Sequence, residues 1–219
     1  EDLPDIDILL ISHDHYDHLD KPTIEFLTKS QPKFYVPLGV GGDLERWGIA
    51  SQQIEEFDWW QEQSIGDVLL AFAPTQHFSG RGMSDSNTTL WGSWVIKTPD
   101  TSLYFSGDSG YFDGFKRIGE RYGPFDLTFI ETGAYDKDWA DIHMTPEQSV
   151  QAHLDVKGKV MMPVHNGTFD LAFHAWSDPL ERVLSAANQN NVTLSTPIVG
   201  EAFAPLGAPI EKRWWQGVQ

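Results

Sequence analysis

The 219-residue sequence predicts an α/β layered sandwich, for two reasons. Short apolar runs typical of buried strands recur along the chain, and several are followed by segments with helix start signals. Hydrophobic residues make up 40% of the chain and aromatic residues 13%, which is enough for a sizeable core. No internal repeat, low-complexity tract or linker marks a boundary, so we expect residues 1–219 to form one domain.

The first apolar run, Ile8–Ile11, predicts a strand that is buried on both faces and ends at a polar loop. Such a strand needs neighbours, yet only seven residues precede it. Either strands from later in the chain pair with it, or the natural protein has upstream residues that this chain lacks. Further strands are predicted over residues 34–36, 68–72, 91–97, 102–106, 127–130, 160–164 and 197–199.

Four segments carry the signals of helices. Asp20-Lys21-Pro22-Thr23 begins one, with proline in the first turn, and the segments 114–122 and 179–190 are two more. A fourth helix begins after Thr145, which is a good N-cap, and Gln148 three residues later can complete a capping box.

Charge and composition exclude several classes of function. The formal net charge of −17 would repel nucleic acid and anionic lipid, so we expect no nucleic-acid partner. No run reaches the eighteen or so apolar residues of a membrane-spanning helix, and residues 1–5 do not resemble a secretory signal. We therefore expect a cytoplasmic protein with no membrane span, of undetermined oligomeric state. The chain has no cysteine, so any metal must be held by nitrogen and oxygen.

The hexapeptide His13-Asp14-His15-Tyr16-Asp17-His18 is the strongest functional signal. It places three imidazoles and two carboxylates directly after a predicted strand, and zinc, manganese and iron all accept such ligands. A turn can direct residues 13 and 15 to one point and residues 17 and 18 to another. The sequence therefore predicts two adjacent metal ions rather than a solvated polar turn.

Three more candidate ligands follow apolar runs: His77, Asp108 and His165. In α/β sheets such strand ends are where sites assemble. Each residue alone has an ordinary structural explanation, as a core histidine or a turn aspartate. Together with the hexapeptide they predict a single site.

The pattern His-x-His-x-Asp-His, a later His, an Asp in a Ser-Gly-Asp turn and a final His resembles the metallo-β-lactamase superfamily. The resemblance implies an αββα sandwich, here lacking its first N-terminal strands, because family members carry strands upstream of the motif. It also implies one metal on His13, His15 and His77 and a second on Asp17, His18 and His165. Asp108 and a water or hydroxide would bridge the two metals. Zinc is the preferred metal, with manganese and iron as alternatives.

Within the superfamily, the chain is most similar to N-acylphosphatidylethanolamine-hydrolysing phospholipase D and its bacterial relatives. The segments that carry this similarity include residues 77–81, 90–94, 105–111, 118–127, 133–135, 143–147 and 165–169. The similarity implies hydrolysis of a lipid or smaller phosphodiester by a hydroxide that bridges the metals. It also places His143 near the substrate, so His143 and Asp17 are the candidate catalytic residues.

Two other functions stay open. The same metals would serve a lactonase or another carbon-ester hydrolase, in which a carbonyl takes the place of phosphorus. The second alternative is a metal-binding module that catalyses no reaction. Asp14 and Asp141 are candidates for orienting the histidine rings, or else are plain surface charges.

Overall fold

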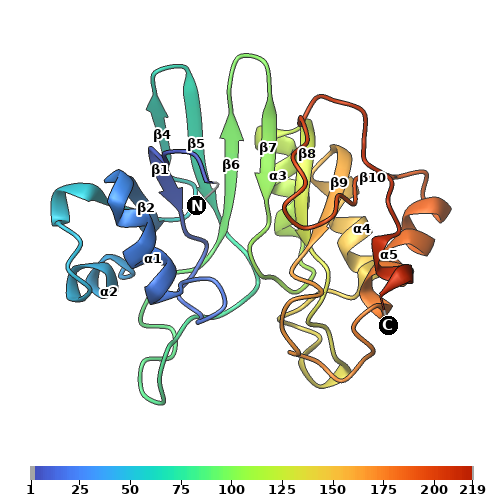
Figure 1. Ribbon diagram of the computed structural model, residues 1–219, viewed down its shortest axis with the longest axis horizontal. Helices are drawn as coiled ribbons and strands as arrows, with labels where there is room; N and C mark the ends of the chain where they lie inside the picture. Colours follow the sequence, from blue (N-terminus) through green and yellow to red (C-terminus); the bar gives the residue numbers. More distant parts are fainter. Residues whose placement is uncertain (1–2, 219) are drawn as a thin grey trace.

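The computed structural model describes residues 3–218 and contains two β-sheets that pack face to face (Figure 1). The smaller sheet has three parallel strands in the order β1-β2-β3. Their bounds are Ile8–Leu10 for β1, Lys33–Pro37 for β2 and Ile54–Phe57 for β3.

The larger sheet has seven strands in the order β10-β9-β8-β7-β6-β5-β4. Strands β4 to β7 are antiparallel to their neighbours, whereas β7, β8, β9 and β10 are mutually parallel. It follows that β5, β7, β8 and β9 all run in one direction and end at the same edge. The bounds are Glu62–Ile65 (β4), Val68–Ala73 (β5), Ser93–Lys97 (β6), Ser102–Phe105 (β7), Phe125–Glu131 (β8), Gly158–Val164 (β9) and Thr193–Leu194 (β10).

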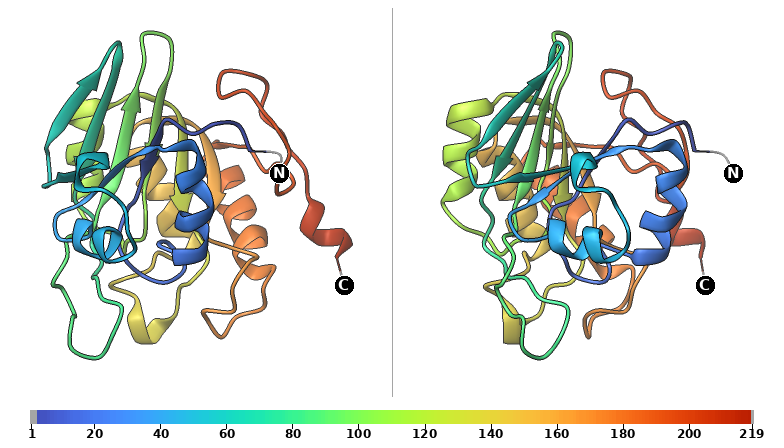
Figure 2. Two further views of the ribbon diagram at one scale, coloured as in Figure 1. Left: turned by 60° about the vertical axis from the view of Figure 1, so that its left-hand side comes forward. Right: turned by 90° about the vertical axis from the view of Figure 1, so that its left-hand side faces the viewer.

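Helices cover the outer face of each sheet. Figure 2 shows α1 and α3 on opposite sides of the pair of sheets. Helices α1 and α2 pack on the small sheet, and α3, α4 and α5 pack on the large one. Their bounds are Lys21–Leu27 (α1), Gly41–Arg46 (α2), Gly114–Tyr122 (α3), Pro146–Asp155 (α4) and Asp178–Gln189 (α5), and short 3₁₀ turns cover Thr28–Ser30, Ser51–Gln53, Lys137–Trp139 and Trp214–Gly217.

The core between the sheets is aromatic. Phe57, Phe72 and Trp94 are fully buried there, and the Trp94 ring lies 5.1 Å from the Phe57 ring and 4.9 Å from the Phe72 ring, centroid to centroid. The Trp94 indole N–H donates to the main-chain carbonyl of Ile11 at 2.8 Å. This bond ties the large sheet to the start of the loop that carries the hexapeptide.

The predicted helices are confirmed with their capping residues. The Asp20 carboxylate caps α1, and Thr145 and Gln148 form both bonds of a capping box at α4. A capping box satisfies two of the main-chain groups that a helix end leaves free. It therefore fixes where α4 begins, just after His143.

The predicted strand at 197–199 is wrong. After Leu194 the chain leaves the sheet, and Thr196 donates its N–H to the carbonyl of Ile210 instead of to β9. Pro197 has no N–H to donate, and Val199 is exposed. The last strand is β10, which ends at Leu194.

Other elements differ from expectation because their patterns are weak. The sequence pattern did not predict α2, β3 or β4, which are short and carry polar residues on one face. Strand β1 is only half-buried rather than buried on both faces, although Leu9 packs toward the helices and Ile8 and Leu10 pack between the sheets. Its neighbour among residues 3–218 is β2, from later in the chain, and β1 lies at the edge of the small sheet. The lack of further upstream strands stays a prediction. Among residues 3–218, no helix has both the length and the apolar character needed to cross a bilayer.

His153 gives a test of the packing beneath the large sheet. It is buried in α4, with its Nδ1 2.7 Å from the Thr128 hydroxyl, and burial lowers its pKa from 6.5 to about 4. A folded-state pKa below the unfolded one means that stability is present above pH 6.5 and is lost as the pH falls toward 4. Between pH 7 and pH 5 this residue should remove roughly 2 kcal/mol from the free energy of unfolding.

We expect His153→Gln to show a smaller loss of stability between these two pH values than the wild-type protein, in urea titrations. The comparison uses the change with pH, so any constant cost of the substitution cancels. An identical loss in both proteins would show that the buried ring is protonated in the folded state.

Candidate metal centre

The candidate residues lie in loops that follow strands of both sheets. The hexapeptide follows β1, His77 follows β5, Asp108 follows β7 and His165 follows β9. Because these strands of the large sheet end at one edge, their loops gather below the sheets in Figure 1. The predicted convergence of distant segments is therefore what the structure shows.

His13, His15 and His77 form one group, whose ligand-type atoms lie within 4.8 Å of one another. His15 Nδ1 lies 3.0 Å from His13 Nε2 and 3.3 Å from His77 Nε2. Three imidazole nitrogens directed at one point match the ligands that zinc and similar ions accept.

Asp17, His18, Asp108 and His165 form the second group, within the same limit. The Asp108 carboxylate connects the two groups. Its Oδ2 atom lies 3.1 Å from His18 Nε2 and 3.4 Å from His165 Nε2, and 3.8 Å from the Nε2 atoms of both His13 and His77. A single buried carboxylate oxygen is thus surrounded by four imidazoles.

The chemistry of these residues fits a metal site. Within residues 3–218, the buried Asp108 Oδ1 atom has no hydrogen-bond partner, although buried polar atoms are nearly always paired. A cation between the two groups would satisfy this oxygen. All ligand-type atoms are nitrogen or oxygen, as the absence of cysteine requires.

Hydrogen bonds from outside the groups set the direction of two rings. His77 Nδ1 lies 3.0 Å from the carbonyl oxygen of Ile142, which can only accept, so Nδ1 carries the proton and Nε2 presents its lone pair to the site. The Ser12 hydroxyl lies 3.0 Å from His13 Nδ1, and this contact holds the orientation of that ring without fixing its tautomer, because a hydroxyl can donate or accept. Such outer bonds orient metal-binding histidines.

The expectation that Asp14 orients a histidine ring is wrong. The Asp14 carboxylate accepts the N–H of Gly80 at 2.7 Å and the hydroxyl of Thr89 at 2.8 Å. Arg81 donates to the main-chain carbonyls of Asp14 and Leu19 at 2.6 and 2.8 Å. These contacts hold the loop after β5 against the hexapeptide loop. The Asp14 carboxylate thus positions two loops of the site instead of a histidine ring.

Asp141 contributes to the site through its main-chain carbonyl and not through its carboxylate. Its side chain is exposed, and its carbonyl oxygen accepts the side-chain amide of Gln76 at 2.8 Å. The groups that orient the rings of His13 and His77 are the Ser12 hydroxyl and the Ile142 carbonyl, and not the carboxylates of Asp14 and Asp141. Sequence inspection gives no signal for the Ile142 carbonyl, since any residue could supply it.

The pKa values divide the histidines into two kinds. Burial lowers the pKa of His13 well below 6.5 and that of His77 to about 3, so both rings are neutral at pH 7. Burial alone would also lower the pKa of His18, but contacts with Asp108 and Asp17 outweigh it and raise that pKa to about 10. The pKa of His165 is raised too, because Asp108 and Asp17 outweigh its burial.

The two aspartates shift in the complementary direction. Burial works to raise the pKa of Asp108 and of Asp17, but their histidine neighbours lower both pKa values. His165 and His18 are the main neighbours in each case. Both carboxylates are therefore ionised, as ligands to a cation must be.

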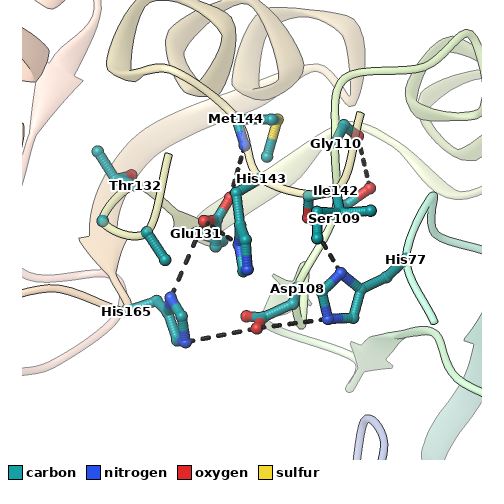
Figure 3. Close-up of polar contacts among 12 residues, drawn as sticks. His77, Asp108, Ser109, Gly110, Glu131, Thr132, Ile142, His143, Met144 and His165 are labelled. Carbon is teal, nitrogen blue, oxygen red and sulfur yellow. Dashed lines mark hydrogen bonds and ion pairs between the residues drawn. The ribbon is translucent and has the colours of Figure 1, made fainter. Parts of the chain in front are cut away.

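His143 lies beside both groups and lines the same pocket. Its ring centroid is 5.1 Å from that of His77 and 5.6 Å from that of His165, and its Nδ1 atom is 2.9 Å from Glu131 Oε1 (Figure 3). The pocket has a volume of about 320 Å³ and is open to solvent. Its lining also includes His15, Asp17, Asp108, Phe78, Trp139, Ile142 and Leu171.

Glu131 is a further residue of the site that the sequence pattern did not identify. It is the last residue of β8 and is completely buried, and one of its oxygens lies 3.9 Å from His165 Nδ1. The predicted strand ended at Ile130, one residue too early. An acidic residue at the end of a strand, at the same sheet edge as Asp108 and His165, was the signal that could have identified it.

Comparison with known proteins agrees with this geometry. The model of the beta-lactamase superfamily domain matches residues 1–166, a range that contains every candidate ligand. The chain belongs to the metallo-β-lactamase superfamily. The resemblance predicted from the motifs is therefore confirmed, and so is the α/β fold with two sheets.

The relatives of this superfamily member include an uncharacterized protein of Mycobacterium tuberculosis, which is 46% identical over 98% of this chain and 58% of its own length. N-acyl-phosphatidylethanolamine-hydrolyzing phospholipase D 1 of Caenorhabditis elegans is 37% identical over 78% of this chain and 51% of its own length. The chain thus spans between half and three fifths of these relatives. The solved structure of Igni18, a metallo hydrolase of Ignicoccus hospitalis, has the same fold, with a TM-score of 0.71 at 21% identity over 90% of this chain and 78% of that one.

Metal loading should release protons. A metal ligand must be deprotonated, and the pKa of about 10 means that the His18 ring carries a proton at pH 7 when no cation is bound. Titration of zinc into metal-free protein by calorimetry, in two buffers with different ionisation enthalpies, should give different heats. Equal heats in both buffers would mean that the metal displaces no proton from His18.

Proposed function

We propose that this chain is a phosphodiesterase of the phospholipase D type that depends on two divalent metal ions, with zinc preferred to manganese or iron. The observation that carries the proposal is the arrangement around Asp108. Two groups of ligand-type atoms meet at one buried carboxylate, at the floor of an open pocket that also contains a histidine outside both groups.

The two groups would hold one ion each. His13, His15 and His77 would bind the first, and Asp17, His18 and His165 the second, with Asp108 between them. When bound, the ions supply an activated water near neutral pH and neutralise charge on a phosphoryl group. The remaining roles fall to the residues of this chain.

Asp17 and His143 are the two residues that would act on the reacting groups. The Asp17 carboxylate is ionised and partly exposed at the pocket, where it can accept a hydrogen bond from the attacking water and orient it. His143 lines the same pocket and can donate a hydrogen bond or proton to the oxygen of the leaving group. A proton acceptor and a proton donor would then line the pocket that the metal ions also line.

The substrate would be a lipid phosphodiester or a smaller diester. Support comes from the C. elegans relative, which is named for hydrolysis of an N-acylated phospholipid. The pocket walls agree with a substrate that has both polar and apolar parts, because Phe78, Trp139 and Leu171 flank the polar floor. The net charge of −17 argues against nucleic acid as the diester.

A panel of substrates tests the proposal. We expect protein reconstituted with zinc to hydrolyse phosphodiesters, and elemental analysis after desalting to find close to two divalent ions per chain. Turnover of lactones or carboxylic esters in place of phosphodiesters would identify a carbon-ester hydrolase. Two bound metals without any turnover would identify a metal-binding module, and absence of bound transition metal would exclude the metal-dependent mechanism.

The role of His143 can be separated from a structural one by the leaving group. If His143 donates a proton as charge develops on the leaving oxygen, His143→Ala should lower kcat and kcat/KM together, by about a hundredfold to ten-thousandfold. A diester with a good leaving group needs little protonation and should lose much less activity. The metal content should not change, because His143 belongs to neither ligand set.

A uniform loss across leaving groups would mean that His143 binds or positions the substrate. Loss of metal, or a lower melting temperature with normal turnover per folded molecule, would make it a structural residue.

A further inference from the structure

Glu131 is a buried carboxylate that the proposed mechanism does not use. Its side chain is completely buried at the end of β8, at the sheet edge where the site lies. A buried carboxylate is costly unless it is paired and hydrogen-bonded. Its partners therefore indicate why it is there.

Both carboxylate oxygens have partners from the segment before α4. Oε1 lies 2.9 Å from His143 Nδ1, and Oε2 accepts the main-chain N–H of Met144 at 3.2 Å (Figure 3). The ion-pair partners that the structure gives this carboxylate within residues 3–218 are two imidazoles, those of His143 and His165. Glu131 is thus paired with histidines and not with a lysine or arginine.

The backbone of Glu131 is fixed just as firmly. Its N–H donates to the hydroxyl of Ser106 at 2.9 Å, and its carbonyl accepts the hydroxyl of Ser149 at 2.6 Å. These bonds connect Glu131 to the end of β7 and to the first turns of α4. The carboxylate is therefore held at a fixed place relative to the site, and the Thr145 capping box fixes the neighbouring segment.

We propose that Glu131 is the positioning residue for His143, which it holds in one orientation and one tautomer. The inference rests on the proposed function in so far as His143 acts in catalysis. An ionised carboxylate only accepts hydrogen bonds, so it requires the proton of the neutral ring to be on Nδ1. Nε2, on the opposite side of the ring, then has a lone pair and no proton. To donate to the leaving oxygen, Nε2 must first take up a proton from solvent, and the Glu131 carboxylate at Nδ1 balances the positive charge that the ring then carries.

The competing role for Glu131 is that of a metal ligand. Atoms of Glu131, His143 and His165 lie within 4.8 Å of one another and offer a third possible ligand group. Both oxygens of Glu131 already have partners outside the two ligand groups, because Oε1 lies 2.9 Å from His143 Nδ1 and Oε2 accepts the Met144 N–H at 3.2 Å. That geometry favours positioning over metal binding.

Glu131→Gln tests the proposal with little change of shape. The amide oxygen can still accept the Met144 N–H, and the NH₂ group then faces His143 Nδ1, which must become the acceptor. The substitution should therefore move the ring proton from Nδ1 to Nε2. Long-range proton–nitrogen correlation spectra of the zinc-loaded protein report this directly, at a pH where the ring is neutral, with the His143 signals assigned from their loss in His143→Gln.

In the wild-type protein we expect the Nδ1–H tautomer, and in Glu131→Gln the Nε2–H tautomer. Zinc content should be the same in both. Against a diester with a poor leaving group, kcat should fall roughly tenfold to a hundredfold with little change in KM. Adding His143→Gln to Glu131→Gln should cost no more than His143→Gln alone, because the two residues act as one unit.

Ser149→Ala is the matched control. It removes a buried hydrogen bond from the backbone of the same residue but leaves the carboxylate and His143 in contact. Its tautomer and its dependence on the leaving group should match those of the wild-type protein, even if its stability falls.

Several results would overturn the inference. They are an Nε2–H tautomer in the wild-type protein, a loss of zinc in Glu131→Gln, or additive kinetic losses in the double variant. The wild-type spectrum decides the matter even if Glu131→Gln fails to fold. If the zinc protein hydrolyses no phosphodiester, the proposed function fails, but the tautomer measurement still tests the Glu131–His143 pair.

Discussion

The site depends on one buried carboxylate. Asp108 Oδ2 lies within 3.8 Å of the Nε2 atoms of four imidazoles that come from three separate loops. A negative charge at this depth is stable only if positive charge is close to it. Without a cation the neighbouring histidines supply it as protons, which explains why the pKa of His18 rises to about 10 while that of Asp108 falls. The same geometry lets a metal replace those protons.

The remainder of the fold brings these loops to one place and keeps them there. The strands β5, β7, β8 and β9 end at a common edge, so residues far apart in the chain become neighbours. The Trp94 indole and the Asp14 carboxylate each join the hexapeptide loop to the large sheet or to its loops. The buried aromatic core thus contributes to function by fixing the distance between the two sheets.

The polarity of the surrounding groups falls with distance from the two ligand groups. The innermost atoms are imidazole nitrogens and carboxylate oxygens. The next groups outward, the Ser12 hydroxyl and the Ile142 carbonyl, set ring orientation, and the Glu131 carboxylate does the same for His143. Toward solvent the pocket becomes partly apolar, at Phe78 and Leu171.

The sequence by itself determined the class of fold, the superfamily and the seven candidate ligands. It could do so because ligand residues are rare types at fixed spacings after apolar strands, and because helix starts such as Thr145-Pro146 carry local signals. It failed where the signal is not local. The pattern at residues 197–199 predicts a strand, yet the chain leaves the large sheet after Leu194.

Only the tertiary structure decided which groups support the ligands. The roles of Glu131, Ser12 and the Ile142 carbonyl arise from contacts between distant segments, and Asp14 proved to hold backbone instead of a ring. Hydrogen bonds of this kind depend on where two loops meet in space, and a main-chain carbonyl has no side-chain identity for a sequence pattern to detect.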